Sequence, residues 1–116
     1  MTAENCLFCK IARGEIPSNI VYQDEHIVAF VDINPQAPKH ILLVPRQHIT
    51  SMADVTPDDG PMLARLFTTA QKIAHEMNID ESGYRLVSNV GPDAGQMVFH
   101  LHFHLLGGRK FGWPPG

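Results

Sequence analysis

The sequence is short of the features that mark secreted, membrane-spanning and nucleic-acid-binding proteins. It has only 2 cysteines in 116 residues, too few for a disulfide-stabilised secreted scaffold. No apolar run approaches the roughly 20 residues of a membrane-spanning helix, and Met1–Asn5 lacks the basic start and apolar stretch of a signal peptide. Acidic side chains outnumber basic ones by 12 to 9, a formal charge of −3. These absences predict a cytoplasmic protein that binds neither nucleic acid nor membrane.

Length and composition indicate one ordinary globular domain. Hydrophobic residues make up 44% and charged residues 18% of the chain, the balance of a folded rather than a disordered protein. A chain of 116 residues encloses one core. It contains no internal repeats, charge blocks or low-complexity linkers. We therefore expect a single domain over residues 1–116 with a short irregular tail.

The order of the predicted elements favours an α+β fold. A short helix over Cys6–Arg13 would be capped by Asn5 and closed by Gly14. A long helix would begin with Thr56 as cap and Pro57 in its first turn. Its apolar stripe is Met62, Leu63, Leu66, Phe67, Ala70, Ile73, Ala74 and Met77. Strands are expected at Ile20–Gln23, His26–Ile33, His40–Val44, Tyr84–Asn89 and Val98–Leu106. This order predicts a five-stranded antiparallel sheet with one long and one short helix.

Three of the 7 histidines alternate with apolar residues near the end of the chain. On a strand, His100, His102 and His104 would point to one face, about 6.5–7 Å apart. The intervening side chains would pack beneath the long helix; they are Phe99, Leu101, Phe103 and Leu105. Three imidazoles in a row can contact one phosphate-sized group together with its leaving group.

Two other interpretations of the histidines are open at this point. One is a half-exposed strand whose polar positions happen to be histidine, although three consecutive alternations argue against it. The other is a three-histidine zinc site with an open fourth position. Zinc ligands normally converge from different elements, whereas three side chains on one strand point nearly parallel. We therefore rank the zinc interpretation lower.

His-Leu-His-Phe-His-Leu-Leu at 100–106 resembles the signature of the histidine triad (HIT) family. Further segments resemble its Hint branch, the nucleoside phosphoramidases; these are Asp32-Ile33-Asn34-Pro35-Gln36-Ala37-Pro38-Lys39-His40, Gly95-Gln96, Gly107-Gly108-Arg109 and Trp113-Pro114-Pro115-Gly116. The resemblance extends over nearly the whole chain from Asn5 onward, and it implies a HIT-like fold.

This resemblance implies hydrolysis of adenosine or guanosine 5′-phosphoramidates to an amine and the nucleoside monophosphate, such as AMP. His102 matches the family's nucleophile, which forms a covalent nucleotidyl intermediate. Neutral imidazole can attack phosphorus near pH 7 because its ordinary pKa is about 6.5. His104 is assigned to phosphate contact and His100 to support from the strand, with His40 in a supporting shell. The resemblance implies no cofactor for catalysis.

A set of nucleotide-binding positions is also implied. Asp32 is assigned to the ribose hydroxyls, although Asp at a strand end also commonly bonds its own backbone in a turn. Asn89 and Gln96 match phosphate-contacting positions, with bracing of the glycine loop as the alternative. The implied set is Asp32, Ile33, Asn89, Gly95, Gln96, Met97, Val98, His102 and His104, and the main-chain N–H groups around 95–98 would stabilise phosphoryl charge. The side chains that could form an apolar slot for the base are Phe8, Ile11, Ile16, Phe30 and Ile33.

Met97 departs from the pattern of this branch, in which a hydroxyl residue often follows Gly-Gln. Methionine donates no strong hydrogen bond, so the departing nitrogen would need the amine's own proton, a water or His104. This departure favours an alternative function, a nucleotide- or partner-binding module with negligible turnover. A zinc-dependent hydrolase is a third hypothesis.

Cys6 and Cys9 have the spacing of a zinc-ligand pair, and a site needs two further ligands. In some HIT proteins, which this arrangement resembles, two cysteines and two histidines close a structural zinc site; the candidates here are His48 and His100. Two buried cysteines on one helix face, or a redox pair, are the alternatives. Redox pairs normally follow a strand, and none precedes Cys6.

The tail around Trp113 predicts a homodimer. A large aromatic side chain on a stiff Pro-Pro segment is unfavourable in water. The resemblance places this tail near the active site of the partner subunit.

Overall fold

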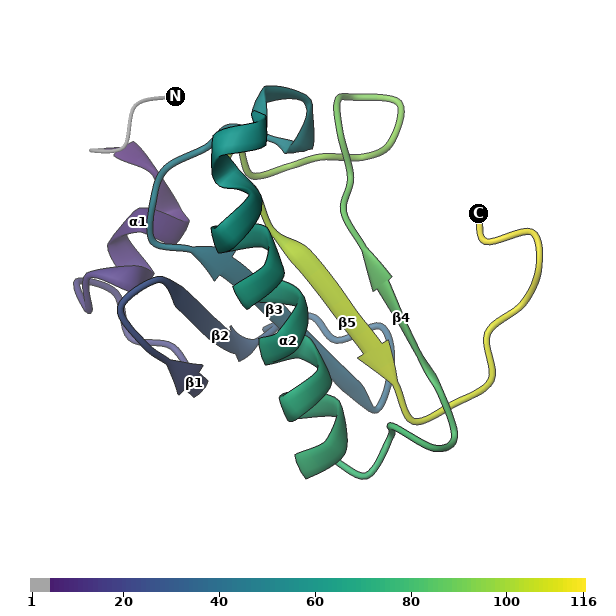
Figure 1. Cartoon of the computed structure of the whole chain (residues 1–116). Helices are drawn as coiled ribbons and strands as arrows, with labels where there is room; N and C mark the ends of the chain where they lie inside the picture. The colour runs from purple at the N-terminus through teal and green to yellow at the C-terminus, as the bar shows by residue number, and fades with distance from the viewer. Residues whose placement is uncertain (1–4) are drawn as a thin grey trace.

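The computed structural model describes residues 5–116 and contains one antiparallel sheet in the order β1-β2-β3-β5-β4 (Figure 1). The helices are α1 (Leu7–Ala12) and α2 (Gly60–Glu76). The strands are β1 (Ile20–Gln23), β2 (Ile27–Val31), β3 (Lys39–Pro45), β4 (Tyr84–Val87) and β5 (Phe103–Gly107). Two 3-10 turns, η2 (Met52–Asp54) and η3 (Pro57–Asp59), precede α2. The predicted α+β architecture with five strands and one long and one short helix is confirmed.

The two helices cover different parts of the sheet. Helix α2 runs across the front of the sheet in Figure 1 and packs Leu66, Ala70 and Ile73 against side chains from β2, β3 and β5. Helix α1 packs on the other face against β2 and β3, with Ile20 of β1 beside them. The side chains that it meets there are Val28, Phe30, Leu42 and Val44. The part of this second face that β5 and β4 form is therefore left for the histidines.

Local capping shifts the helix starts from their predicted positions. Cys6, not Asn5, caps α1, and its sulfur accepts a hydrogen bond from the Cys9 N–H at 3.4 Å. Thr56 and Asp59 form a capping box around η3, so α2 begins only at Gly60. The strands predicted at 26–33 and 84–89 are shorter in the structure, at Ile27–Val31 and Tyr84–Val87.

The strand predicted over 98–106 begins only at Phe103, so this prediction was wrong for its first half. Main-chain groups of the earlier residues bond outside the sheet. The Leu101 N–H donates to the Ile49 carbonyl at 2.6 Å, and the Ser88 hydroxyl donates to the His102 carbonyl at 2.8 Å. Because these partners compete with the ladder, the segment bends before it joins β3.

The bend changes which side chains reach each face. Leu101, Phe103 and Leu105 pack beneath α2 as predicted. Phe99 does not, since it is 42% exposed. Within residues 5–116, no helix combines the length and the apolar character that crossing a membrane requires.

Candidate active site

His102 lies just before β5 with its ring held in one tautomer. Its Nδ1 is 2.7 Å from the His100 carbonyl. A carbonyl only accepts, so Nδ1 carries the proton and Nε2 keeps its lone pair. Phe8 packs edge-on against the ring at 5.0 Å between centroids, and His102 is 7% exposed. The arrangement presents one oriented nitrogen lone pair, the form of imidazole that acts as a nucleophile.

His104 is linked to His40, which lies on the neighbouring strand β3. His104 Nδ1 is 2.8 Å from His40 Nε2, and His40 Nδ1 accepts the main-chain N–H of Gln36 at 3.0 Å. The Gln36 N–H can only donate, so neutral His40 carries its proton on Nε2 and donates it to His104. His104 then keeps its own proton on Nε2. The ring centroids of His102 and His104 are 5.1 Å apart, which places a lone pair and an N–H donor side by side.

Burial keeps these rings neutral near pH 7. It lowers the pKa of His102 and of His40 below the usual value, although the nearby Asp32 carboxylate acts in the opposite direction on both. The pKa of His104 falls to about 4 because burial and the neighbouring His102 and His40 all disfavour its charged form. The cluster therefore presents neutral imidazoles at neutral pH.

Asp32 combines a turn with a contact to the histidines. Its Oδ1 accepts a hydrogen bond from the Asn34 N–H at 2.8 Å. This is the bond to the local backbone that was the alternative to ribose binding. Its Oδ2 lies 3.4 Å from His40 Nε2. One carboxylate thus shapes the loop before β3 and faces the histidine cluster.

The glycine loop at 91–96 is braced by the side chain of Gln96. Its amide accepts the Gly91 N–H at 3.0 Å and donates to the carbonyls of Thr50 and Val98 at 3.0 and 3.2 Å. The side chain of Gln96 thus braces the glycine loop, which was the alternative to phosphate contact. Asn89 is partly buried beside this loop.

The main-chain N–H groups expected to face a phosphate divide into two pairs. Those of Gly95 and Gln96 are used inside the loop, since they donate to Pro92 and Gly91. Within residues 5–116, those of Met97 and Val98 donate to no acceptor. This segment therefore offers fewer free N–H donors than predicted, only those of Met97 and Val98. The Met97 side chain is 86% exposed.

The five apolar side chains proposed for a base slot do not form one surface. Phe8, Ile11 and Phe30 are buried in the core beneath α1, and Ile16 packs against that core. Ile33 is 98% exposed on the loop after β2. Core packing accounts for the first four, and Ile33 alone is open to a ligand.

His100 leaves the row of histidines and joins the cysteines, so the prediction of three rings on one face was wrong for this residue. Its Nδ1 is 3.2 Å from Cys6 Sγ and 3.3 Å from Cys9 Sγ, and His48 Nδ1 lies 3.3 Å from Cys9 Sγ. The ligand atoms of Cys6, Cys9, His48 and His100 all lie within 4.8 Å of one another. The bend at 98–102 turns the His100 ring inward, where it is fully buried.

These four residues fit a zinc ion. His100 Nε2 donates to the Pro45 carbonyl at 2.8 Å, so Nδ1 carries a lone pair directed at both sulfurs. Tetrahedral zinc would separate S and N ligands by about 3.6 Å, close to the distances found. His48 differs, because its buried Nε2 has no hydrogen-bond partner among residues 5–116. Two thiols and two imidazoles are the usual donor set of closed structural zinc sites.

The cysteines lack the character of a reactive pair in the absence of a metal. Burial, together with the neighbouring Cys6, raises the pKa of the Cys9 thiol to about 11. A thiol of that pKa is protonated near pH 7 and is a poor nucleophile. This argues against the redox interpretation of Cys6 and Cys9.

The fold does not bring His100, His102 and His104 together as a zinc site. His100 faces the cysteines, whereas His104 belongs to a second group with Asp32 and His40. That second group is held together by the hydrogen bond between His40 and His104.

Sequence reasoning missed Ser88 and gave no role to Gln36 and Arg109. Ser88 binds the His102 carbonyl, and Gln36 sets the tautomer of His40. Arg109 donates to the Gln36 carbonyl. The only signal in the sequence was that Gln36 and Arg109 fall inside the segments that carry the family resemblance.

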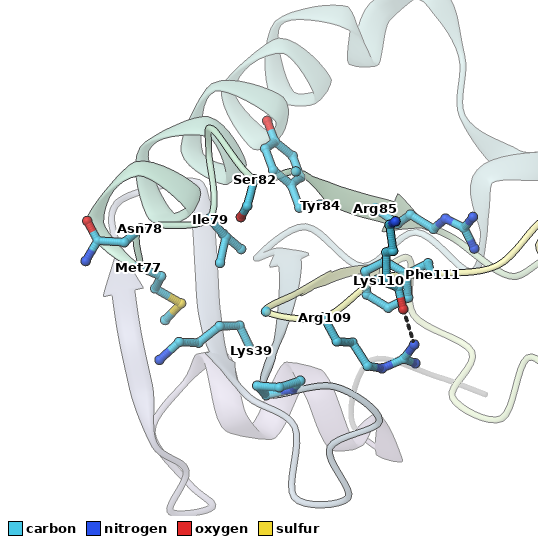
Figure 2. A pocket seen from close by; sticks show the side chains of 13 residues that line it. Lys39, Met77, Asn78, Ile79, Ser82, Tyr84, Arg85, Arg109, Lys110 and Phe111 are labelled. Atoms are coloured by element: carbon cyan, nitrogen blue, oxygen red, sulfur yellow. Dashed lines mark hydrogen bonds between the residues drawn. The ribbon is translucent and has the colours of Figure 1, made fainter.

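Two cavities flank the end of the sheet. One of about 710 Å³ lies beside the C-terminal end of α2, and none of the residues that line it is a predicted site residue (Figure 2). Another of about 590 Å³ is lined in part by Val87, Leu106 and the Pro-rich tail. Val87 pairs with His104 across the β4–β5 ladder, so this second cavity adjoins the histidine cluster.

Comparison with known proteins places the chain in a family. The family profile described as "HIT domain" matches residues 13–111. The purine nucleoside phosphoramidase of Escherichia coli (strain K12) is 51% identical over 110 residues, which are 95% of this chain and 92% of that protein. The crystal structure of a HIT family hydrolase from Legionella pneumophila superposes with a TM-score of 0.95 at 54% identity, covering 97% of this chain and 100% of that one.

A second solved structure agrees. A histidine triad protein from Clostridium difficile has a TM-score of 0.92 at 45% identity and covers 97% of each chain. An uncharacterized HIT-like protein of Synechocystis is 48% identical over 98% of this chain and 99% of its own length. The chain therefore belongs to the HIT domain family, and it is a hydrolase of that family.

Proposed function

We propose that this HIT hydrolase cleaves purine nucleoside 5′-phosphoramidates through a covalent intermediate on His102. The observation that carries the proposal is the oriented lone pair on His102 Nε2 beside the N–H of His104. The relative from Escherichia coli, named as a purine nucleoside phosphoramidase, supports this class of substrate.

In the first step, His102 Nε2 forms a bond to phosphorus while the phosphorus–nitrogen bond breaks. The leaving nitrogen takes one proton and departs as a neutral amine. Met97 carries no proton to give and neutral His104 is too weak an acid, so a water supplies it, and the hydroxide that forms takes up the proton released in the second step. In the second step, water attacks phosphorus, loses one proton, and releases the nucleoside monophosphate with His102 restored.

Three groups of contacts support the substrate in this proposal. The Nε2–H of His104 and the free N–H groups of Met97 and Val98 stabilise charge on the phosphoryl oxygens. The Asp32 carboxylate accepts hydrogen bonds from the ribose hydroxyls, and the exposed Ile33 side chain contacts the base. The amine extends into the 590 Å³ cavity beside Val87.

The test compares His102→Ala with His26→Ala on an adenosine 5′-phosphoramidate. His26 is an exposed histidine outside the cluster and serves as the matched control. We expect hydrolysis to vanish only in His102→Ala, and a quench in alkaline denaturant, in which a phosphorus–imidazole bond survives, to trap a labelled nucleotidyl adduct in the wild type. Unchanged hydrolysis in His102→Ala would contradict the mechanism.

The alternative function is a binding module with negligible turnover, and exposed Met97 in place of a donor favours it. The same assay separates the two. A wild-type protein that binds AMP in calorimetry but releases no amine would be a binding module.

We also propose that Cys6, Cys9, His48 and His100 hold a structural zinc ion. The ion would anchor α1, and thereby Phe8, against the ring of His102; it takes part in no catalytic step. Elemental analysis should find about one zinc per chain in the wild type and none in Cys9→Ser. Hydrolysis that persists in chelator would exclude a zinc-dependent reaction. A cytoplasmic location belongs to this proposal, because such a site needs cysteines that stay reduced.

A homodimer is the remaining part of the proposal. Trp113 is 84% exposed, and β4 is an edge strand whose outer side is unpaired in the sheet. Light scattering at micromolar concentration should give the mass of two chains, and a monomer would refute the assembly.

A further inference from the structure

Arg109 is fixed on the loop that precedes β3. Its Nη2 and Nε donate to the Gln36 carbonyl at 3.0 and 3.3 Å. Its Nη1 donates to the Lys110 carbonyl at 3.0 Å, the dashed line in Figure 2. The Phe111 ring lies 4.3 Å from the guanidinium carbon. A planar guanidinium can make these contacts simultaneously, whereas an ammonium cannot.

Close packing at Gly108 brings Arg109 to this loop. Gly108 has φ of +90°, and a Cβ added there would lie 2.9 Å from Pro38 Cβ. Only glycine combines this backbone conformation with so close an approach. The turn after β5 therefore packs directly on the loop at 34–38.

The loop in turn fixes His40. The Gln36 N–H donates to His40 Nδ1 at 3.0 Å, and the Gln36 side chain donates to the Asn34 carbonyl at 3.0 Å. The hydrogen bond between His40 and His104 can run in either direction in principle, since each nitrogen can donate or accept. The Gln36 N–H sets the direction together with the Asp32 carboxylate, which lies 3.4 Å from His40 Nε2, because the Gln36 N–H occupies Nδ1 of His40 and leaves the proton on Nε2.

The direction matters for catalysis. With His40 donating, His104 presents an N–H to the substrate. If the Gln36 N–H moved away, His40 could carry its proton on Nδ1 and accept from His104. His104 would then present a lone pair to an anionic phosphoryl group, which would repel it.

We propose that Arg109 is a positioning residue that holds Gln36 so that His104 presents a proton to the phosphoryl group. This inference rests on the proposed function only for its kinetic consequence. The tautomers of His40 and His104 are properties of the free protein and can be measured without substrate.

The experiment compares Arg109→Ala and Arg109→Lys with Lys110→Ala, a neighbouring exposed cation, as the matched control. Nitrogen-15 spectra of the imidazoles report the tautomers, and circular dichroism reports folding. In Arg109→Ala we expect His104 to populate both tautomers and kcat to fall about 10–100-fold, with KM changed by less than about threefold. Arg109→Lys should recover only part of kcat, and added guanidinium ion should restore activity to Arg109→Ala.

Wild-type tautomers in a folded Arg109→Ala variant would overturn the inference, and so would an unchanged kcat. If the wild-type protein hydrolysed no phosphoramidate, the proposed function would fail. The spectra would still decide whether Arg109 fixes the tautomers.

Discussion

His100 and His102 stand two residues apart and are locked in opposite tautomers. The Pro45 carbonyl accepts a hydrogen bond from His100 Nε2–H, and the His100 carbonyl accepts one from His102 Nδ1–H. The first ring directs its lone pair at two sulfurs, and the lone pair of the second, on Nε2, has no hydrogen-bond partner among residues 5–116. The comparison teaches that main-chain acceptors, not residue type, separate the candidate metal ligand His100 from the proposed nucleophile His102.

Replacing each ring in turn is the strongest way to break this comparison. His102→Ala should lower kcat about 10³–10⁶-fold, as loss of a nucleophile does elsewhere, with little change in unfolding by urea. His100→Ala should instead lower the free energy of unfolding by about 2–5 kcal/mol, since it leaves a cavity in a buried cluster. Equal losses of activity and of stability in both variants would remove the distinction.

The second prediction concerns acid. His104 has its pKa lowered to about 4 and His40 has its pKa lowered as well, whereas unfolded histidine titrates near 6.5. Between these values the unfolded chain binds more protons, so the free energy of unfolding should fall as the pH falls from 6.5 toward 4. The slope is at most about 1.4 kcal/mol per pH unit for each such group. Denaturation series at several pH values measure it, and a flat profile would contradict buried, neutral rings.

Asp32→Asn tests whether the carboxylate serves only the turn. Asparagine keeps an acceptor for the Asn34 N–H but removes the charge that raises the pKa of the nearby histidines. The pH at which kcat falls as the histidines become protonated should therefore move to a lower value. If Asp32 binds ribose, KM should rise about tenfold. If neither that pH nor KM changed, Asp32 would be only a turn residue.

The smallest effect is expected for Ser88→Ala. It removes the hydroxyl that donates to the His102 carbonyl, a hydrogen bond of about 1 kcal/mol. Activity should fall only a few-fold, and the free energy of unfolding should fall by about 1 kcal/mol, the value of that hydrogen bond. Thr68→Ala, which removes an exposed hydroxyl on α2, is the matched control. A large loss of activity would mean that Ser88 acts on the ring of His102 directly.

Periodicity, together with cap and turn residues, was enough to predict the helices and strands, although not the order of the strands in the sheet. The long helix was predicted from apolar steps of three and four residues, and Leu66, Ala70 and Ile73 of that stripe are buried. Alternation over 98–106 predicted a strand, and its second half, from Phe103 onward, is confirmed as β5. Both patterns are local, since each residue's face follows from its position in one element.

The partners that lie far away in the chain were decided by tertiary structure. Alternation predicted His100 on the same face as His102, but the chain bends between them, where the Leu101 N–H donates to Ile49 and the His102 carbonyl accepts from Ser88. Likewise, the sequence determined that histidines would gather near the end of the chain, whereas the carbonyl of Pro45 and the N–H of Gln36 decided which nitrogen of His100 and of His40 carries the proton. A tautomer depends on a partner placed in space, and a pattern of neighbours along one strand holds no information about it.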